Sequence, residues 1–251
     1  MSLPEDARIW FEVQVETLKR VHSSWLPGVP IELLTQARKL ALGRRWLAKR
    51  LCTVSPVLFG LPAELDSDAL GRLRAAAWLA PLVADPFECA LDLGSLAMAA
   101  TIRTLVNRPE VVKIRGALGP ERYARVLAFP APPSQSAPAT AAGDLDLVER
   151  LVRCGAAEFA GFADSAHPAW GESVRLTYER AWWFDACAPS LAPAAAEACL
   201  RLRIQQPQGG ATNPSVSPRV NPSVNPSVNP GVNPAAQPVA GLRPRSAGET
   251  H

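Results

Sequence analysis

Residues that favour β-strands are scarce in this sequence. Aromatic residues make up 6% of it, and tyrosine occurs only at Tyr123 and Tyr178. Alanine and leucine dominate instead, and both are strong helix formers. We therefore predict an all-α fold, an irregular bundle of about seven to nine helices.

Long apolar runs are also missing. The longest weakly polar stretch, residues 89–102, contains Asp92 and is shorter than the roughly 20 residues that cross a bilayer. Glu5 and Asp6 occupy the positions where a signal peptide carries basic residues, and the five cysteines are an odd number without paired spacing. These features predict a cytoplasmic protein.

Motifs of the common enzyme classes are absent from the sequence. It has no G-x-S-x-G elbow, phosphate-binding loop, dinucleotide fingerprint, H-E-x-x-H or C-x-x-C, and Gly94-Ser95 falls inside a helical pattern. His22, His167 and His251 have no Cys, Asp or Glu at metal-ligand spacing, and His167 is interpreted as a loop or cap residue. We expect no catalytic residue, metal, cofactor or small-molecule substrate; an enzyme with an unrecognised site is the least favoured alternative.

An excess of one charge is missing as well. The formal charge is +3, and the residues beyond Ile204 contribute +2 of it through three arginines and Glu249. The main body is therefore nearly neutral, so a general attraction to nucleic acid or to anionic lipid is not indicated.

Helical periodicity and its punctuation divide the chain into four parts. We predict a helical domain over residues 1–129, a linker over 130–143 with four prolines, and a smaller helical unit over 144–206 that packs on the first. Within the first domain, residues 31–51 read as one helix whose apolar stripe includes Leu33 and Leu40. The segment Asp85-Pro86-Phe87-Glu88 reads as a capping box that starts a long helix.

The last part, residues 207–251, repeats Asn-Pro-x-Val with a proline at every fourth position. This period matches neither a helix nor a strand, and proline removes amide donors. One valine per repeat buries too little area to offset about 1 to 2 kcal/mol of backbone entropy per residue. We therefore predict a disordered tail.

Basic residues form a ridge on the predicted helix 31–51. At 100° per residue, Arg38, Arg45 and Lys49 share one face, while Arg44 falls within the apolar stripe and must pair, extend to solvent or lie at an interface. The ridge is interpreted as a solvated face, as a docking surface for an acidic protein partner, or, least favoured, as a nucleic-acid contact.

The densest aromatic cluster is Trp182-Trp183-Phe184. Adjacent helical residues point about 100° apart, so the three side chains cannot all face one small core. Trp182 and Trp183 are therefore candidates for a protein interface, and packing against the first domain is the alternative.

A resemblance to a known family appears in the middle of the chain. The run Leu93-Gly94-Ser95-Leu96-Ala97-Met98-Ala99-Ala100-Thr101-Ile102-Arg103, followed by residues 111–119 and Tyr123, resembles the SctK/YscK proteins of type III secretion systems, in their Hrp-type branch. The resemblance extends over residues 85–129, with a further similarity at residues 201–204, and the Asn-Pro tail departs from it.

This resemblance implies a helical, non-enzymatic adaptor. Such adaptors lie in the cytoplasmic sorting platform at the inner-membrane secretion apparatus, and they link the inner-membrane ring protein SctD to the SctQ assembly that holds the ATPase. The family has no catalytic residues to transfer to this chain. A secretion chaperone or a regulatory protein-binding module is the alternative.

The tail generates a first prediction. Truncation after Gln206 is expected to change the melting temperature by less than about 5 °C, because the repeats contribute no apolar area to a core. Thermal unfolding of the full and truncated chains, followed by circular dichroism, measures this difference. A larger loss would contradict the expectation and show that the tail packs.

Overall fold

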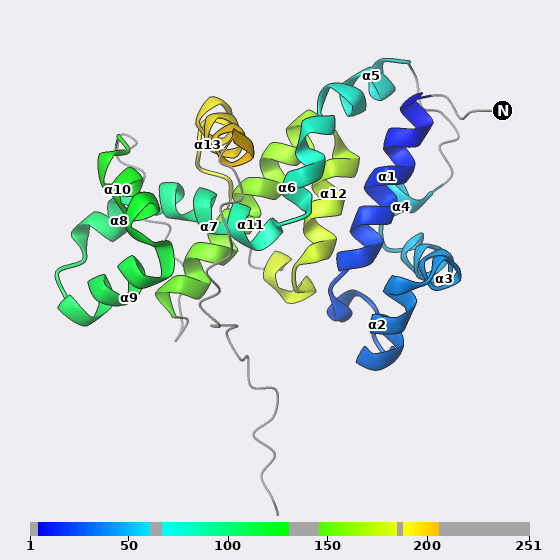
Figure 1. Ribbon diagram of the computed structural model, residues 1–251, viewed down its shortest axis with the longest axis horizontal. Coiled ribbons are helices and arrows are strands. Elements are labelled where there is room, and N and C mark those ends of the chain that lie inside the picture. Colours follow the sequence, from blue (N-terminus) through cyan, green and yellow to red (C-terminus); the bar gives the residue numbers. More distant parts are fainter. Residues whose placement is uncertain (1–4, 61–66, 131–145, 185–187, 206–251) are drawn as a thin grey trace, which may run out of the picture. The chain divides into compact units, whose positions relative to one another are not determined.

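The computed structural model describes residues 5–60, 67–130, 146–184 and 188–205, and within these ranges it is helical with no strand (Figure 1). The predicted all-α class is confirmed. The linker beyond Pro130 and the tail lie outside the described residues. The α-helices are Glu5–Arg20 (α1), Ile31–Lys39 (α2), Ala41–Leu51 (α3), Pro56–Phe59 (α4), Ser67–Ala75 (α5), Ala80–Val83 (α6), Pro86–Ala97 (α7), Ala99–Thr104 (α8), Arg108–Leu118 (α9), Pro120–Ala128 (α10), Leu147–Ala166 (α11), Pro168–Thr177 (α12) and Pro193–Gln205 (α13). Three 3₁₀ turns join them, Ser23–Trp25 (η1), Ala77–Leu79 (η2) and Arg180–Trp183 (η3).

The described residues contain thirteen α-helices, more than we expected, because several predicted helices are interrupted. The prediction of one helix over residues 31–51 is wrong, since Leu40 has extended backbone angles, φ −95° and ψ 141°. Met98, with φ −97° and ψ 17°, separates α7 from α8. None of the described helices is long and apolar enough to cross a membrane.

Two glycines let the backbones of α7 and α11 touch. A methyl group placed on Gly155 would lie 1.7 Å from the carbonyl oxygen of Ala90, and one placed on Gly94 would lie 1.9 Å from that of Leu151. No Cβ atom fits at such distances, so only glycine allows this crossing. Seven of the twelve residues of α7 and ten of the twenty residues of α11 are buried, and together the two helices form the centre of the core.

Helices from both predicted segments share this core. α12 packs on α11 and on α1, where the buried hydroxyls of Thr17 and Ser173 are hydrogen-bonded at 2.5 Å. The indole Nε1 of Trp170 donates to the carbonyl of Leu73 at 3.4 Å. All the described helices accordingly belong to one compact unit, residues 1–209.

A buried carboxylate connects α7 to two other helices. Asp92 is 3% exposed and accepts hydrogen bonds from Nε of Arg122 on α10, at 2.6 Å, and from Nη1 of Arg203 on α13, at 2.9 Å. The same arginines reach Glu88 and Asp85, each at 2.7 Å. The residues of the predicted capping box do start α7, but Asp85 makes no side-chain cap because its carboxylate pairs with Arg203.

A second buried carboxylate positions the start of α13. Glu158 on α11 is 2% exposed and accepts hydrogen bonds from the backbone and hydroxyl of Ser190, at 2.6 and 2.7 Å, and from the backbone of Leu191 at 3.2 Å. A carboxylate with this many donors is tolerated in a core because its lost hydration is replaced. Glu158 and Asp92 together hold α13 against the α7–α11 pair.

The close crossing predicts a large difference between two equal substitutions. Gly155→Ala is expected to lower the free energy of unfolding by more than about 3 kcal/mol, because the methyl group forces the backbones apart. Gly116→Ala on α9, where no atom of the described residues lies within 4 Å of the added carbon, should instead stabilise the protein by about 0.5 to 1 kcal/mol through helix propensity. Urea unfolding of both variants measures this; equal effects would contradict the role given to Gly155.

The buried ion-pair network predicts a similar contrast. Asp92→Asn is expected to cost about 2 to 4 kcal/mol, because Arg122 and Arg203 lose a charge that they share in a buried site. Glu197→Gln removes a surface pair with Arg201 on α13 and should cost less than about 1 kcal/mol. Urea unfolding compares them, and a cost for Asp92→Asn no greater than that of the control would show that the network does not hold the helices.

Candidate docking surface

The candidate surface is carried by α2 and α3, which meet at a sharp turn. Leu40 ends α2, and Nη1 of Arg44 then donates to the carbonyls of Arg38 and Lys39, at 3.0 Å each, at the end of α2. Gly43 permits the turn, since a methyl group there would lie 2.4 Å from the carbonyl oxygen of Ala37. Arg44, which the sequence placed within the apolar stripe, therefore caps α2.

The turn divides the predicted basic ridge between two helices. Arg38 lies on α2, whereas Arg45 and Lys49 lie one turn apart on α3. The shared face was deduced from an uninterrupted helix, so that geometry is corrected: Arg45 and Lys49 remain on one face, and Arg38 lies on another helix. Both residues on α3 are exposed, and their side chains make no hydrogen bond or ion pair within the described part of the chain.

Arg38 is half-buried and has a structural role. Its Nη2 donates to the carbonyl of Val21, which ties α2 to the end of α1, while its Nε is buried with no hydrogen-bond partner among the described residues. Burial lowers the pKa of the Arg38 guanidinium from its ordinary value, though the group remains a cation at neutral pH. Replacing Arg38 would therefore disturb the fold as well as the surface.

Cations greatly outnumber acids on this pair of helices. Residues 31–51 contain six basic residues and one acid, Glu32. Lys39 is exposed and has no side-chain partner in the described ranges, and Arg50 lies over the ring of Trp46 at 4.8 Å. A depression of about 450 Å³ opens beside the turn. The described residues that line it include no carboxylate; they are Lys19, Thr35, Arg38, Lys39 and Arg44.

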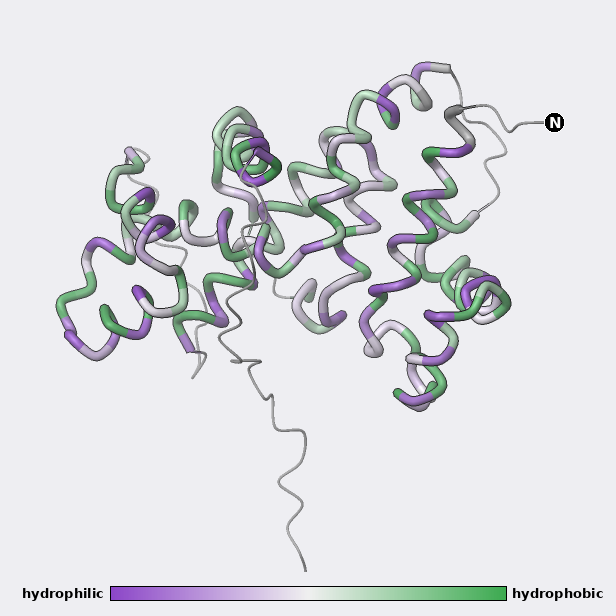
Figure 2. Tube along the Cα trace, in the orientation of Figure 1, coloured by the Kyte–Doolittle hydropathy of each residue, from purple (hydrophilic) through white to green (hydrophobic). Residues whose placement is uncertain are grey.

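Apolar side chains lie exposed on the same helices. The core contacts are made by Leu34, Ala37, Leu47 and Leu51, whereas Leu33 and Leu40, expected within the buried stripe, are 51% and 60% exposed. Leu42 is 77% exposed and Ile31 is 53% exposed. The surface is thus both basic and apolar, and hydrophilic and hydrophobic residues are interspersed along α2 and α3 in Figure 2.

The tryptophans that were candidates for an interface pack on Tyr178. Trp182 stacks on that ring at 5.6 Å and Trp183 meets it edge-on at 6.2 Å. Nε1 of Trp183 donates to the carbonyl of Arg175 at 3.3 Å, and both indoles are half-buried. Phe184, at 76% exposure, is the aromatic residue of this cluster that faces solvent.

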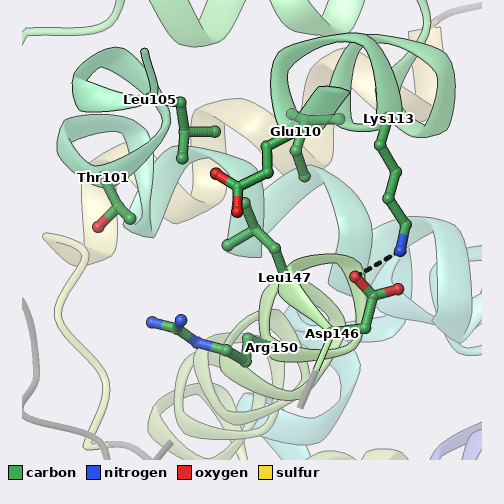
Figure 3. Close-up of a pocket in the computed structure, with 8 residues that line it drawn as sticks. Thr101, Leu105, Glu110, Lys113, Asp146, Leu147 and Arg150 are labelled. Carbon is green, nitrogen blue, oxygen red and sulfur yellow. Dashed lines mark ion pairs between the residues drawn. The ribbon is translucent and has the colours of Figure 1, made fainter. Parts of the chain in front are cut away.

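A second depression was not anticipated from the sequence. It measures about 350 Å³ and lies among α8, α9 and the start of α11 (Figure 3). Lys113 and Asp146 form an ion pair at 2.9 Å at its side, and Glu110 extends toward its centre. Its other lining residues are Thr101, Leu105, Ile114, Leu147 and Arg150. They come from segments that the linker separates, so no local pattern reveals the site.

Groups with catalytic potential have structural roles in the described structure. Nδ1 of His167 accepts from the backbone of Ala169 at 3.1 Å at the start of α12, as expected of a cap residue, and burial lowers its pKa. Ser95 donates to the carbonyl of Asp92 at 2.7 Å, and burial raises the pKa of Cys199 to about 12. No set of three or more His, Cys, Asp or Glu side chains in the described ranges is placed to hold a metal ion.

Comparison with known proteins returns no relative: no family model, curated protein or solved structure matches the chain.

Proposed function

We propose that this protein is a non-enzymatic adaptor that docks through α2 and α3 on an acidic surface of a protein partner. The observation that carries the proposal is the excess of six cations over one acid on these helices, with Lys39, Arg45 and Lys49 free of side-chain partners within the described structure. Like charges this close repel one another, and carboxylates supplied by another surface relieve the repulsion.

A protein partner fits this surface better than a nucleic acid. A phosphate backbone is bound by a broad basic patch, whereas residues 1–204 carry 23 basic and 22 acidic residues. The exposed leucines beside the cations find contacts in the apolar core of a protein interface and have none on a phosphate backbone.

The resemblance of residues 85–129 to the SctK/YscK proteins supports a specific setting. We assign the acidic partner to the cytoplasmic domain of an SctD-like ring protein, with an SctQ-like protein at a second surface. On this proposal the adaptor is cytoplasmic and lies peripherally at the inner-membrane secretion apparatus. Trp182, Trp183 and the exposed Phe184 beside them are the candidates for the second surface.

Charge reversal on α3 tests the proposal. Arg45→Glu combined with Lys49→Glu is expected to slow association with the SctD-like domain about tenfold at low salt, because electrostatic steering is reversed. Arg38 is left intact because it bonds to Val21. Circular dichroism and the melting temperature should stay close to those of the parent, since both side chains are exposed and unpaired within the described structure.

Arg108→Glu combined with Arg115→Glu on α9 is the matched control. Both residues are exposed, and the change in net charge is the same. Surface plasmon resonance at low and high salt separates the two variants. Equal slowing by both would attribute the effect to net charge alone, and unchanged binding by the α3 variant would leave α2 and α3 as a solvated surface.

A further inference from the structure

Leucine occupies two unfavourable positions at the turn between α2 and α3. Leu40 is the N-cap of α3, with extended backbone angles and no side-chain hydrogen bond to the first amides of the helix. Leu42, in the first turn of α3, is 77% exposed, and Leu40 is 60% exposed. Neither side chain belongs to the core or to the partly buried set that packs against it.

Leucine at each of these two positions makes the isolated protein less stable than a polar residue would. Serine, threonine, aspartate or asparagine at the N-cap satisfies amides that leucine leaves to water. Each exposed leucine also leaves most of its apolar area in solvent. Sequences break such local rules mainly at functional sites, so the turn is a candidate for an apolar contact with another molecule.

The surroundings of the two leucines specify the chemistry of that molecule. Lys39 precedes Leu40 and Arg44 follows Leu42 by two residues, and both cations line the depression of about 450 Å³ beside the turn. Among the described residues no carboxylate lines this depression, although its lining residue Lys19 pairs with Glu16. The two leucines do not line the depression themselves, but they are close in sequence to two of its lining residues, Lys39 and Arg44, at the same turn.

We propose that Leu40 and Leu42 are the apolar anchor for an acidic amphipathic helix of the partner, whose carboxylates enter the depression. This inference rests on the proposed function and adds the form of the segment that binds. The apolar face of the partner helix covers the two leucines, and its acidic flank faces Lys39, Arg38 and Arg44. Anchors of this kind dominate binding because water is excluded from them.

Other occupants fit less well. A second copy of the chain in a two-fold contact would place this basic surface against itself, which repels. An anionic bilayer attracts proteins with a broad excess of cations, whereas residues 1–204 carry 23 basic and 22 acidic residues. A simple polyanion would meet the cations and leave the leucines uncovered.

The test combines Leu40→Ser and Leu42→Ser in the full chain. Two probes are used, a synthetic helical peptide of glutamate and leucine with leucine on one face, and poly-L-glutamate of equal length. The variant is expected to bind the amphipathic peptide about tenfold more weakly and poly-L-glutamate as before. Its melting temperature should stay within about 3 °C of the parent, because serine is a good N-cap.

Val106→Ser combined with Val112→Ser is the matched control. These valines are 96% and 63% exposed, so the variant loses apolar surface elsewhere and should bind both peptides as the parent does. Equal weakening of both peptides by the leucine variant, or no weakening of either, overturns the anchor. Binding of the parent to phosphatidylserine vesicles that the leucine variant loses, with peptide binding unaffected, overturns it in favour of a membrane.

Failure of the anchor is distinguishable from failure of the proposed function. Suppose that Arg45→Glu with Lys49→Glu abolishes binding of both peptides while the leucine variant binds normally. This result would support the basic docking surface and contradict the leucine anchor. If the parent protein binds neither peptide, both the docking surface and the leucine anchor are contradicted.

Discussion

The contact between the backbones of α7 and α11 is the constraint on which the rest of the structure depends. Gly94 and Gly155 let these helices approach to a distance that no side chain permits. α7 then presents Asp92 to α10 and α13, and α11 presents Glu158 to the segment before α13. If the crossing were wider, both carboxylates would be displaced from their donors.

The two buried carboxylates, Asp92 and Glu158, mainly fix the positions of the neighbouring helices. Burying a charge costs hydration, and a saturated network does little more than restore what was lost. An arrangement in which Asp92 or Glu158 lost its donors would carry an uncompensated buried charge, and this penalty selects one placement of α10 and α13. Stability comes mostly from the apolar core around α11, and the carboxylates select one packing of it.

The surface on α2 and α3 differs from the core, because its backbone interactions are satisfied and several of its side chains are not. The backbone of the turn is stabilised, because Arg44 donates hydrogen bonds to the end of α2 and Gly43 has no Cβ atom to collide with Ala37. Three cations of this surface, Lys39, Arg45 and Lys49, have no side-chain partner among the described residues, and exposed leucines lie on the same two helices. Exposed leucines beside these cations are the features that the proposed docking function uses.

The sequence by itself determined the helical class, the start of α7 at Asp85-Pro86 and the capping role of His167, because composition and capping signals act within a few residues. It also identified Arg38, Arg45 and Lys49 as an unusual concentration of charge. Gly43 was the weak point of the helix predicted over residues 31–51, and it does permit the turn. The sequence did not place the break at Leu40, because the apolar character of that residue continues the helical period.

Only the tertiary structure decided how these elements meet. Arg38 donates a hydrogen bond to the carbonyl of Val21. Trp182 and Trp183 pack on Tyr178, whose hydroxyl donates to the carbonyl of Pro86 in the first segment. Asp92 is hydrogen-bonded to Arg203, which is 111 residues away in the sequence. Periodicity records which face of a helix is apolar, but the partner of that face depends on contacts between residues far apart in sequence, and their geometry exists only after the chain has folded.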